Sequence, residues 1–227
     1  MRVFFHVEGI GPMDLFVVGD LHGCYYTFRR LLDLYWDPSK ERLVQVGDLI
    51  DRGNYSPETV AFARELKATY SDQVIFLKGN HEFEIIEHVE AGPNAHWLRQ
   101  CGQKTLKQYH ALKRDLIEDI EWFKTLPLCW ENDYLLISHA GISHDKTPFD
   151  EENPFGVLWN RSPLKTINKL QVIGHTPCDF PTYTQESHSW NIDTGAAYHG
   201  TLTGMKMDET GIITQIYQVK PSDKDIL

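Results

Sequence analysis

Residues with metal-binding side chains stand directly behind five short apolar segments of this sequence. They are carboxylates, imidazoles and one carboxamide, and in chain order they are Asp20, His22, Asp48, Asn80, His139 and His175. Nearly every one lies beside a glycine, which lets the backbone turn sharply and approach a neighbouring segment closely. In open α/β sheets, ligands gather beyond the carboxyl ends of the strands. We therefore predict that the six side chains meet at one metal site.

The types of ligand restrict both the metal and the reaction. Carboxylate, imidazole and amide donors without a thiolate suit Mn²⁺, Fe or Zn²⁺ better than Cu(I) or an iron–sulfur cluster. The set is larger than one tetrahedral ion needs, so it indicates two metal ions. Two ions about 3.5–4 Å apart, joined by a bridging carboxylate, can clamp the attacking and leaving oxygens during hydrolysis of a phosphate ester.

Each motif could also have an ordinary structural role. A single Gly-Asp pair or a lone histidine after a strand is usually part of a turn. Five such ends in one chain, each with suitable chemistry, are difficult to explain as five unrelated turns. We therefore favour the metal site.

The segments that must position these residues alternate between strand and helix patterns. The apolar segments are short and rich in β-branched residues, which favours strands at Leu15–Val18, Leu43–Val46, Val74–Leu77, Tyr134–Ile137 and Leu170–Ile173. Residues 25–36 repeat apolar side chains at helical spacing, and residues 56–70 begin with Ser56 as an N-cap and Pro57 at the first helical position. This order predicts a βαβαβ unit.

The rest of the chain predicts a longer helix followed by strands. Residues 102–125 carry one apolar stripe and are expected to form a single amphipathic helix that caps the core. Residues 191–207 and 211–219 resemble a closing antiparallel meander. No repeat, low-complexity tract or linker divides residues 1–227. We predict a single domain of the α/β class, or of the α+β class, with a mixed sheet.

Composition excludes several kinds of partner. The formal net charge of -10 and the isoelectric point near 5.5 argue against binding to a nucleic acid polymer or to an anionic membrane, because both need a surplus of Lys and Arg. No run approaches the roughly 18 apolar residues of a membrane span, and residues 1–14 lack the apolar core of a signal peptide. The four cysteines form no CxxC pair, which favours a reducing compartment. We expect a cytoplasmic protein whose anionic substrate meets locally placed positive charge.

Most of the remaining histidines are expected to be structural. His81 and His88 stand in a stretch similar to a zincin helix, but seven residues of helix separate them by about 10.5 Å, so they cannot share one zinc ion. Histidines expected at the surface or satisfied in the core are His6, His88, His96, His110, His144, His188 and His199. Among them His199 is the one expected nearest a cleft.

The strand-end motifs together resemble a known family. In order they are GDLHG at 19–23, GDLIDRG at 47–53, GNHE at 79–82, HAG at 139–141 and GH at 174–175. With VLWNR at 157–161 and IDTGAAYHGTLTGM at 192–205, this series resembles the bacterial and phage branch of the PPP phosphoprotein phosphatases, within the calcineurin-like metallophosphoesterases. The resemblance implies a β-sandwich of mixed sheets flanked by helices, with two divalent metal ions. Mn²⁺ is the preferred metal, and Fe or Zn²⁺ are the alternatives.

The resemblance also implies which residues hold each ion. Asp20 and His22 would bind the first metal ion, and Asp48 would bridge both ions. The second ion would be completed by three residues, Asn80, His139 and His175.

The catalytic roles follow from the same resemblance. A hydroxide shared by the two ions would attack phosphorus in line, without a phosphoenzyme. His81 would protonate the leaving alkoxide, and Asp51 would hold its imidazolium. Arg52 and Arg161 would grip the non-bridging phosphate oxygens. The structural alternatives are a surface salt bridge for Arg52 and a cation at a helix end for Arg161.

Two substrate classes are consistent with this resemblance: phosphoserine and phosphothreonine in proteins, and symmetrical dinucleoside tetraphosphates. Asp51-Arg52 in GDLIDRG favours the protein phosphatase, because the tetraphosphate hydrolases resemble GDLVARG. The chain has HAG where eukaryotic phosphatases show HGG, and TGAAYHG at 194–200 in place of their SAPNY stretch, so their protein partners are not carried over. The sequence does not indicate an oligomeric state. A catalytically dead binding protein is disfavoured because every ligand and the acid are present.

Overall fold

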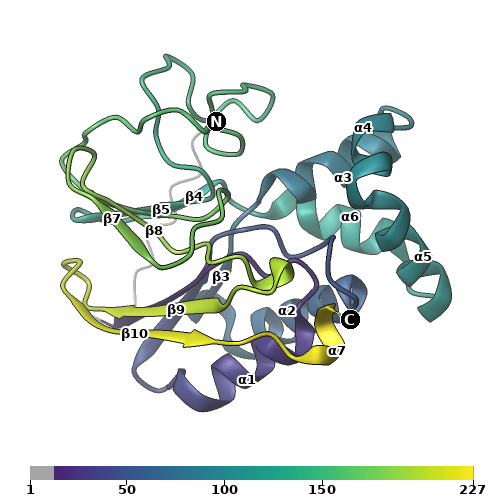
Figure 1. The fold of residues 1–227 in the computed structure, drawn as a ribbon, viewed down its shortest axis with the longest axis horizontal. Coiled ribbons are helices and arrows are strands. Elements are labelled where there is room, and N and C mark those ends of the chain that lie inside the picture. The colour runs from purple at the N-terminus through teal and green to yellow at the C-terminus, as the bar shows by residue number, and fades with distance from the viewer. Residues whose placement is uncertain (1–12, 227) are drawn as a thin grey trace.

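The computed structural model describes residues 13–226 and contains two five-stranded mixed sheets, with helices under the first sheet and at one side of the pair (Figure 1). The first sheet has strands β1 (Asp14–Val18), β2 (Glu41–Gln45), β3 (Val74–Phe76), β9 (Leu202–Met207) and β10 (Ile213–Val219), in the order β10-β9-β1-β2-β3. The first three run parallel and are joined by helices α1 (Tyr25–Tyr35) and α2 (Ser56–Tyr70). The predicted βαβαβ unit and mixed α/β class are confirmed.

The second sheet contains the remaining strands. They are β4 (Cys129–Glu131), β5 (Leu135–Ser138), β6 (Leu170–Ile173), β7 (Thr182–Thr184) and β8 (Ser189–Asn191), in the order β4-β5-β6-β8-β7. The meander predicted for residues 191–207 and 211–219 is wrong in part. β9 and β10 form an antiparallel hairpin, but β8 lies in the other sheet, parallel to β6. Pattern alone does not assign a three-residue strand to a sheet, because long-range packing decides between the two.

Alternation along the strands builds two apolar layers. Leu15 and Val17 of β1 face the layer between the sheets, where Ile137 of β5 also lies. Phe16 and Val18 point to the opposite side, into the layer that α1 and α2 cover. Successive side chains of a strand point to opposite faces, so β1 is buried on both. The strands that carry the candidate residues are therefore fixed from both sides.

A group of helices lies beside the sheets, between β3 and β4 in the sequence (Figure 1). It comprises α3 (Asn80–Glu90), α4 (Ala95–Trp97), a π-helical turn (Leu98–Gly102), α5 (Gln103–Leu112) and α6 (Leu116–Thr125). The single helix predicted over residues 102–125 is wrong. Lys113 adopts a left-handed conformation with φ 53°, and the Asp115 side chain caps α6 by accepting the N–H of Ile117 at 2.9 Å. Asp115 is a residue type that favours an N-cap, and it marks the start of a second helix although the apolar stripe continues through it.

Smaller elements complete the described chain. They are the 3₁₀ turns Ser71–Gln73 and Ala196–Tyr198 and the C-terminal helix α7 (Asp223–Ile226). The N-cap predicted at Ser56 is wrong by one residue, because Tyr55 takes that place and Ser56 is the first residue of α2. The Ser56 hydroxyl accepts the N–H of Asp51 at 2.9 Å. Within residues 13–226, no helix has the length and apolar character needed to cross a bilayer.

Candidate metal centre and active site

The loops that follow β1, β2, β3, β5 and β6 meet at one place, although the strands belong to two sheets. All six predicted ligands are buried there, with exposed fractions of 0–7%. The closest group has donor atoms from three loops. His139 Nε2 lies 3.1 Å from both Asn80 Oδ1 and His175 Nδ1, and the last two atoms are 2.9 Å apart. Three donor atoms converge on one point, as the ligands of a shared ion do.

Asp48 lies between two groups of donors. Its Oδ1 is 3.5 Å from His139 Nε2, and its Oδ2 is 3.4 Å from His22 Nε2. The two oxygens thus face different histidines, which is the arrangement a bridging carboxylate requires. Asp20 flanks this group: its carboxylate accepts the backbone N–H of His175, at 3.1 and 3.3 Å.

Hydrogen bonds to the backbone orient two of the imidazoles. His22 Nδ1 lies 2.9 Å from the carbonyl oxygen of Ile50, and His139 Nδ1 lies 3.1 Å from that of Val46. A carbonyl only accepts, so Nδ1 carries the proton and Nε2 keeps its lone pair toward the centre. Metal-binding histidines are commonly held in this way.

The backbone is strained where the candidate residues lie. Nine non-glycine residues in the described chain have positive φ, and five of them are candidates: His22, Asp48, Asp51, Arg52 and His175. Such conformations persist only when the surroundings enforce them, and they concentrate at functional sites. The side chains are held in place at a cost in backbone energy.

Two glycines make the close approach possible. A Cβ on Gly79 would lie 2.2 Å from Asp48 Oδ1, and a Cβ on Gly174 would lie 1.9 Å from Asp20 Oδ1. Any side chain would displace these carboxylates. The predicted use of glycine beside the ligands is thus found in the structure.

Glu82 of the GNHE motif, for which no role was predicted, holds the loops together. Its buried carboxylate accepts three backbone N–H groups, from Asp48, Leu49 and Gly79, each at 2.9 Å. The loop after β2 and the start of α3 are thereby fixed to one side chain.

His81 and Asp51 form a buried pair beside the metal ligands. His81 Nδ1 is 2.5 Å from Asp51 Oδ2, and its Nε2 is 3.9 Å from Asp48 Oδ2. Asp51 also accepts hydrogen bonds from Trp97 Nε1 at 2.7 Å and from the Thr105 hydroxyl. Sequence reasoning missed both donors, because nothing in the spacing of residues 97 and 105 relates them to residue 51.

Helix α5 also grips the loop that contains Asp51. Lys104 Nζ donates to the carbonyl of Arg52 at 2.7 Å, and the Gln108 side-chain amide donates to that of Gly53 at 2.9 Å. The first part of the predicted capping helix therefore positions the site, in addition to covering core.

Charge and burial shift the pKa values of these groups in ways that suit cation binding. Burial lowers the pKa of His139, and it lowers that of His175 to about 3, with His139 adding to the effect. Both imidazoles are thus neutral, which is the form that binds a metal. Burial, with repulsion from Asp193 and Asp48, raises the pKa of Asp20. Carboxylates that repel one another in this way favour a cation among them.

The pKa values of the pair move in opposite directions. Burial raises the pKa of Asp51, but hydrogen bonds from His81, Thr105 and Trp97 outweigh it and hold that pKa below its usual range. Burial lowers the pKa of His81, but the charge of Asp48 and the hydrogen bond to Asp51 raise it well above its usual range. His81 is therefore protonated and Asp51 ionised, so the pair is an imidazolium and a carboxylate.

The two candidate arginines differ in burial. Arg52 is half-buried, in contact with the His22 ring, with its guanidinium carbon 5.2 Å from the centre of the Tyr198 ring. Arg161 is exposed, and its charge contributes to lowering the pKa of His175. Tyr198 brings the TGAAYHG segment to the site, as its ring centre is 6.5 Å from that of His22.

The other histidines do not join the cluster. His88 is half-buried against Trp97, and the exposed ones are His96, His110, His144, His188 and His199. His6 lies outside the described residues.

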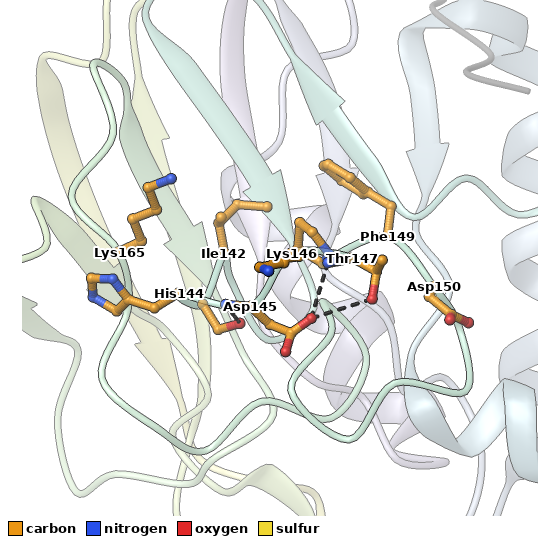
Figure 2. Close-up of a pocket in the computed structure, with 10 residues that line it drawn as sticks. Ile142, His144, Asp145, Lys146, Thr147, Phe149, Asp150 and Lys165 are labelled. Atoms are coloured by element: carbon orange, nitrogen blue, oxygen red, sulfur yellow. Dashed lines mark hydrogen bonds between the residues drawn. The ribbon is translucent and has the colours of Figure 1, made fainter.

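A surface pocket of about 710 Å³ lies at the loop that follows the HAG motif (Figure 2). Residues 142–150 and Lys165 line it, and none of the candidate residues does. Figure 2 shows the Asp145 carboxylate bonded to Thr147 within the loop.

The residues present fit divalent metal ions. Carboxylate, imidazole and amide donors converge, and the buried Oδ2 of Asp193, whose charge acts on Asp20, has no hydrogen-bond partner in residues 13–226. Comparison with known proteins agrees: the model of the calcineurin-like phosphoesterase family matches residues 13–203, a range that includes all ten candidate residues. The chain belongs to the calcineurin-like phosphoesterase family. It is a metallophosphoesterase, of a family that uses divalent metal ions.

Relatives of this phosphoesterase carry three different names. One is the asymmetrical bis(5'-nucleosyl)-tetraphosphatase PrpE of Bacillus mycoides, 30% identical over 229 residues, which covers 85% of this chain and 90% of that protein. The symmetrical bis(5'-nucleosyl)-tetraphosphatase of Aromatoleum aromaticum is 37% identical over 132 residues, which are 57% of this chain and 45% of that protein. The match thus spans less than half of that relative. Serine/threonine-protein phosphatase 1 of Salmonella typhimurium is 30% identical over 218 residues, covering 89% of this chain and 95% of that protein.

Solved structures confirm the fold. The crystal structure of a metallophosphoesterase from Sphaerobacter thermophilus aligns with a TM-score of 0.62 at 12% identity, over 93% of this chain and 90% of that one.

Proposed function

We propose that this phosphoesterase is a serine/threonine protein phosphatase that hydrolyses phosphomonoesters with two divalent metal ions, Mn²⁺ being the metal we expect. The observation that carries the proposal is the buried hydrogen bond of 2.5 Å between Asp51 and His81. It gives the leaving alkoxide of a serine or threonine a proton donor beside the metal ligands.

Each candidate residue has a defined task in the proposed reaction. Ions held by the six predicted ligands would supply Lewis-acid activation of the phosphate and of a water nucleophile. His81 gives its proton from Nε2, while Asp51 holds the opposite nitrogen and stabilises the imidazolium beforehand. Arg52 and Arg161 bind the non-bridging phosphate oxygens. Arg52 is half-buried and Arg161 exposed, so the Arg52 side chain loses less conformational entropy when it binds.

Relatives of both substrate classes match this chain over nearly their full length. The Salmonella typhimurium phosphatase is covered to 95%, and the asymmetrical bis(5'-nucleosyl)-tetraphosphatase PrpE of Bacillus mycoides, 30% identical, is covered to 90%. Coverage therefore does not separate the classes, and the proposal rests on the Asp51–His81 pair. The second candidate function is hydrolysis of dinucleoside tetraphosphates, which is favoured by the higher identity of 37% within the matched part.

The deciding experiment compares kcat/KM for a phosphothreonine peptide and for diadenosine tetraphosphate, with Mn²⁺ supplied to the same preparation. We expect a preference for the peptide of at least about tenfold, which corresponds to about 1.4 kcal/mol in the transition state. A preference for the dinucleotide would overturn the protein phosphatase and leave the phosphoesterase chemistry in place.

A further inference from the structure

Asp193 is a buried carboxylate that the proposed reaction does not use. It lies two residues beyond β8, is 2% exposed, and belongs to the segment that crosses from the second sheet to the first. Its Oδ1 accepts the N–H of Gly195 at 3.0 Å, but its Oδ2 has no hydrogen-bond partner in the described chain. A buried ionisable oxygen without a partner is unfavourable unless a cation or water compensates it.

The position of Asp193 is fixed against two loops of the metal centre. A Cβ on Gly19 would lie 3.7 Å from the Asp193 Cα, so the chain passes directly beside the residue that precedes Asp20. The Asp193 carbonyl accepts the N–H of Cys178 at 2.9 Å and its thiol at 3.0 Å, which binds it to the loop after His175. Burial raises the pKa of both Asp20 and Asp193; the charge of Asp193 adds to the shift of Asp20, and the charge of Asp48 adds to that of Asp193.

Neither a turn nor an ion pair accounts for the whole geometry of Asp193. As a turn-forming residue, Asp193 needs only Oδ1, which Gly195 satisfies. As a counter-ion for an arginine, it would lie within 4 Å of one, and residues 13–226 contain no such ion pair of Asp193, although Arg52 and Arg161 carry charge nearby. Both roles leave Oδ2 without a partner.

We propose that Asp193 is a further carboxylate of the metal centre, and that its Oδ2 stabilises the divalent cation held beside Asp20. The inference rests on the metal site of the proposed function. It adds a fourth acidic group to Asp20, Asp48 and the Asp51 of the catalytic pair. It also gives the residue directly before the TGAAYHG segment a task in binding the cation.

Calorimetric titration of chelated protein with MnCl₂ tests this directly. Asp193→Asn keeps the shape and the Oδ1 acceptor but removes the charge from Oδ2. The matched control is Asp179→Asn, which makes the same change at an exposed position close in sequence. Melting temperatures in EDTA and in Mn²⁺ give a second readout that does not depend on activity.

We expect Asp193→Asn to weaken Mn²⁺ binding about 10- to 100-fold, as loss of a carboxylate that supports a metal site commonly does, while Asp179→Asn stays within about twofold of the unmodified protein. In EDTA, the Asp193→Asn protein should melt no lower than the unmodified one, because a repelling charge has been removed. Unchanged Mn²⁺ affinity, or a clearly lower melting temperature in EDTA, would overturn the proposal. Failure of the unmodified protein to bind Mn²⁺ would instead refute the metal site of the proposed function, and this inference with it.

Discussion

The role of the helices in catalysis can be tested at Thr105. Its hydroxyl donates to Asp51 Oδ1, both side chains are completely buried, and Thr105 lies in the first turn of α5. Thr105→Val preserves the shape and the methyl group while it removes only the donor. Asp51 then keeps two donors, His81 and Trp97, both on its other oxygen.

The expected size of the effect follows from that loss. A hydrogen bond to a charged group contributes about 1.5–3 kcal/mol to stability. We therefore expect the free energy of unfolding to fall by about 2 kcal/mol, and the melting temperature by about 4–8 °C for a chain of this size. The Asp51 carboxylate gains freedom to rotate, so the His81 ring is less well placed. Because a misplacement of about 1 Å can cost up to about 100-fold in rate, we expect kcat to fall roughly tenfold.

The assay measures kcat and KM on a phosphothreonine peptide with saturating Mn²⁺, together with bound metal. Thr105→Ser is the matched control, because it retains the hydroxyl and loses the methyl group. We expect it to keep most of the turnover despite a stability loss of about 0.8 kcal/mol for the missing group. KM and metal content should be unchanged in both variants. A valine variant that turns over as fast as the serine variant would refute the claim that α5 positions the proton donor.

Three further substitutions separate the metal ligands from the proton donor. His81→Asn should retain Mn²⁺ in metal analysis but lose about 10²–10⁴-fold in kcat, and full activity would remove its role as general acid. Asp48→Asn should lose Mn²⁺ binding itself, since its oxygens face both groups of histidines; a fully metallated variant would contradict the bridging role. Asp51→Asn bears on the pH profile: burial lowers the pKa of His81, but the charge of Asp48 and the Asp51 hydrogen bond raise it. Because only the protonated imidazole can donate, kcat falls as pH rises through that raised pKa. In the asparagine variant this alkaline limb of the kcat profile should shift to lower pH. A limb at the same pH in both proteins would count against the pair.

The candidate ligands were predictable because each follows a strand within a few residues. An apolar run followed by a glycine and a ligand residue, as in Gly19-Asp20 and Gly174-His175, can be read from the sequence without knowing the order of the strands. The division of the strands into two sheets was not predictable in this way. Strands β5 and β6 reach the site from a sheet different from that of β1 to β3, and only the packing between sheets decides this.

The residues that hold the site were missed because their partners are distant in sequence. Trp97 and Thr105 lie 46 and 54 positions from Asp51, and no period or motif links them. The break at Lys113 has a similar origin. The Arg114 guanidinium and the Tyr109 hydroxyl both donate hydrogen bonds to the buried Asp119 carboxylate. These bonds hold the turn between α5 and α6, and the apolar stripe of residues 102–125 gave no sign of them.

The charge distribution connects the acidic composition with the proposed chemistry. Asp20, Asp48 and Asp193 are buried together, and repulsion between them raises the pKa of Asp20 further than burial alone. A cation bound there removes this repulsion, so metal affinity and stability of the fold are coupled. A metal ion at free concentration [L] raises the free energy of unfolding by RT ln(1 + [L]/Kd). The pair of Asp51 and His81 is satisfied by its own hydrogen bonds and does not depend on that cation to the same degree. Substitutions among the first group should therefore alter the melting temperature mainly in the presence of Mn²⁺, whereas Thr105→Val should lower it equally with and without the metal.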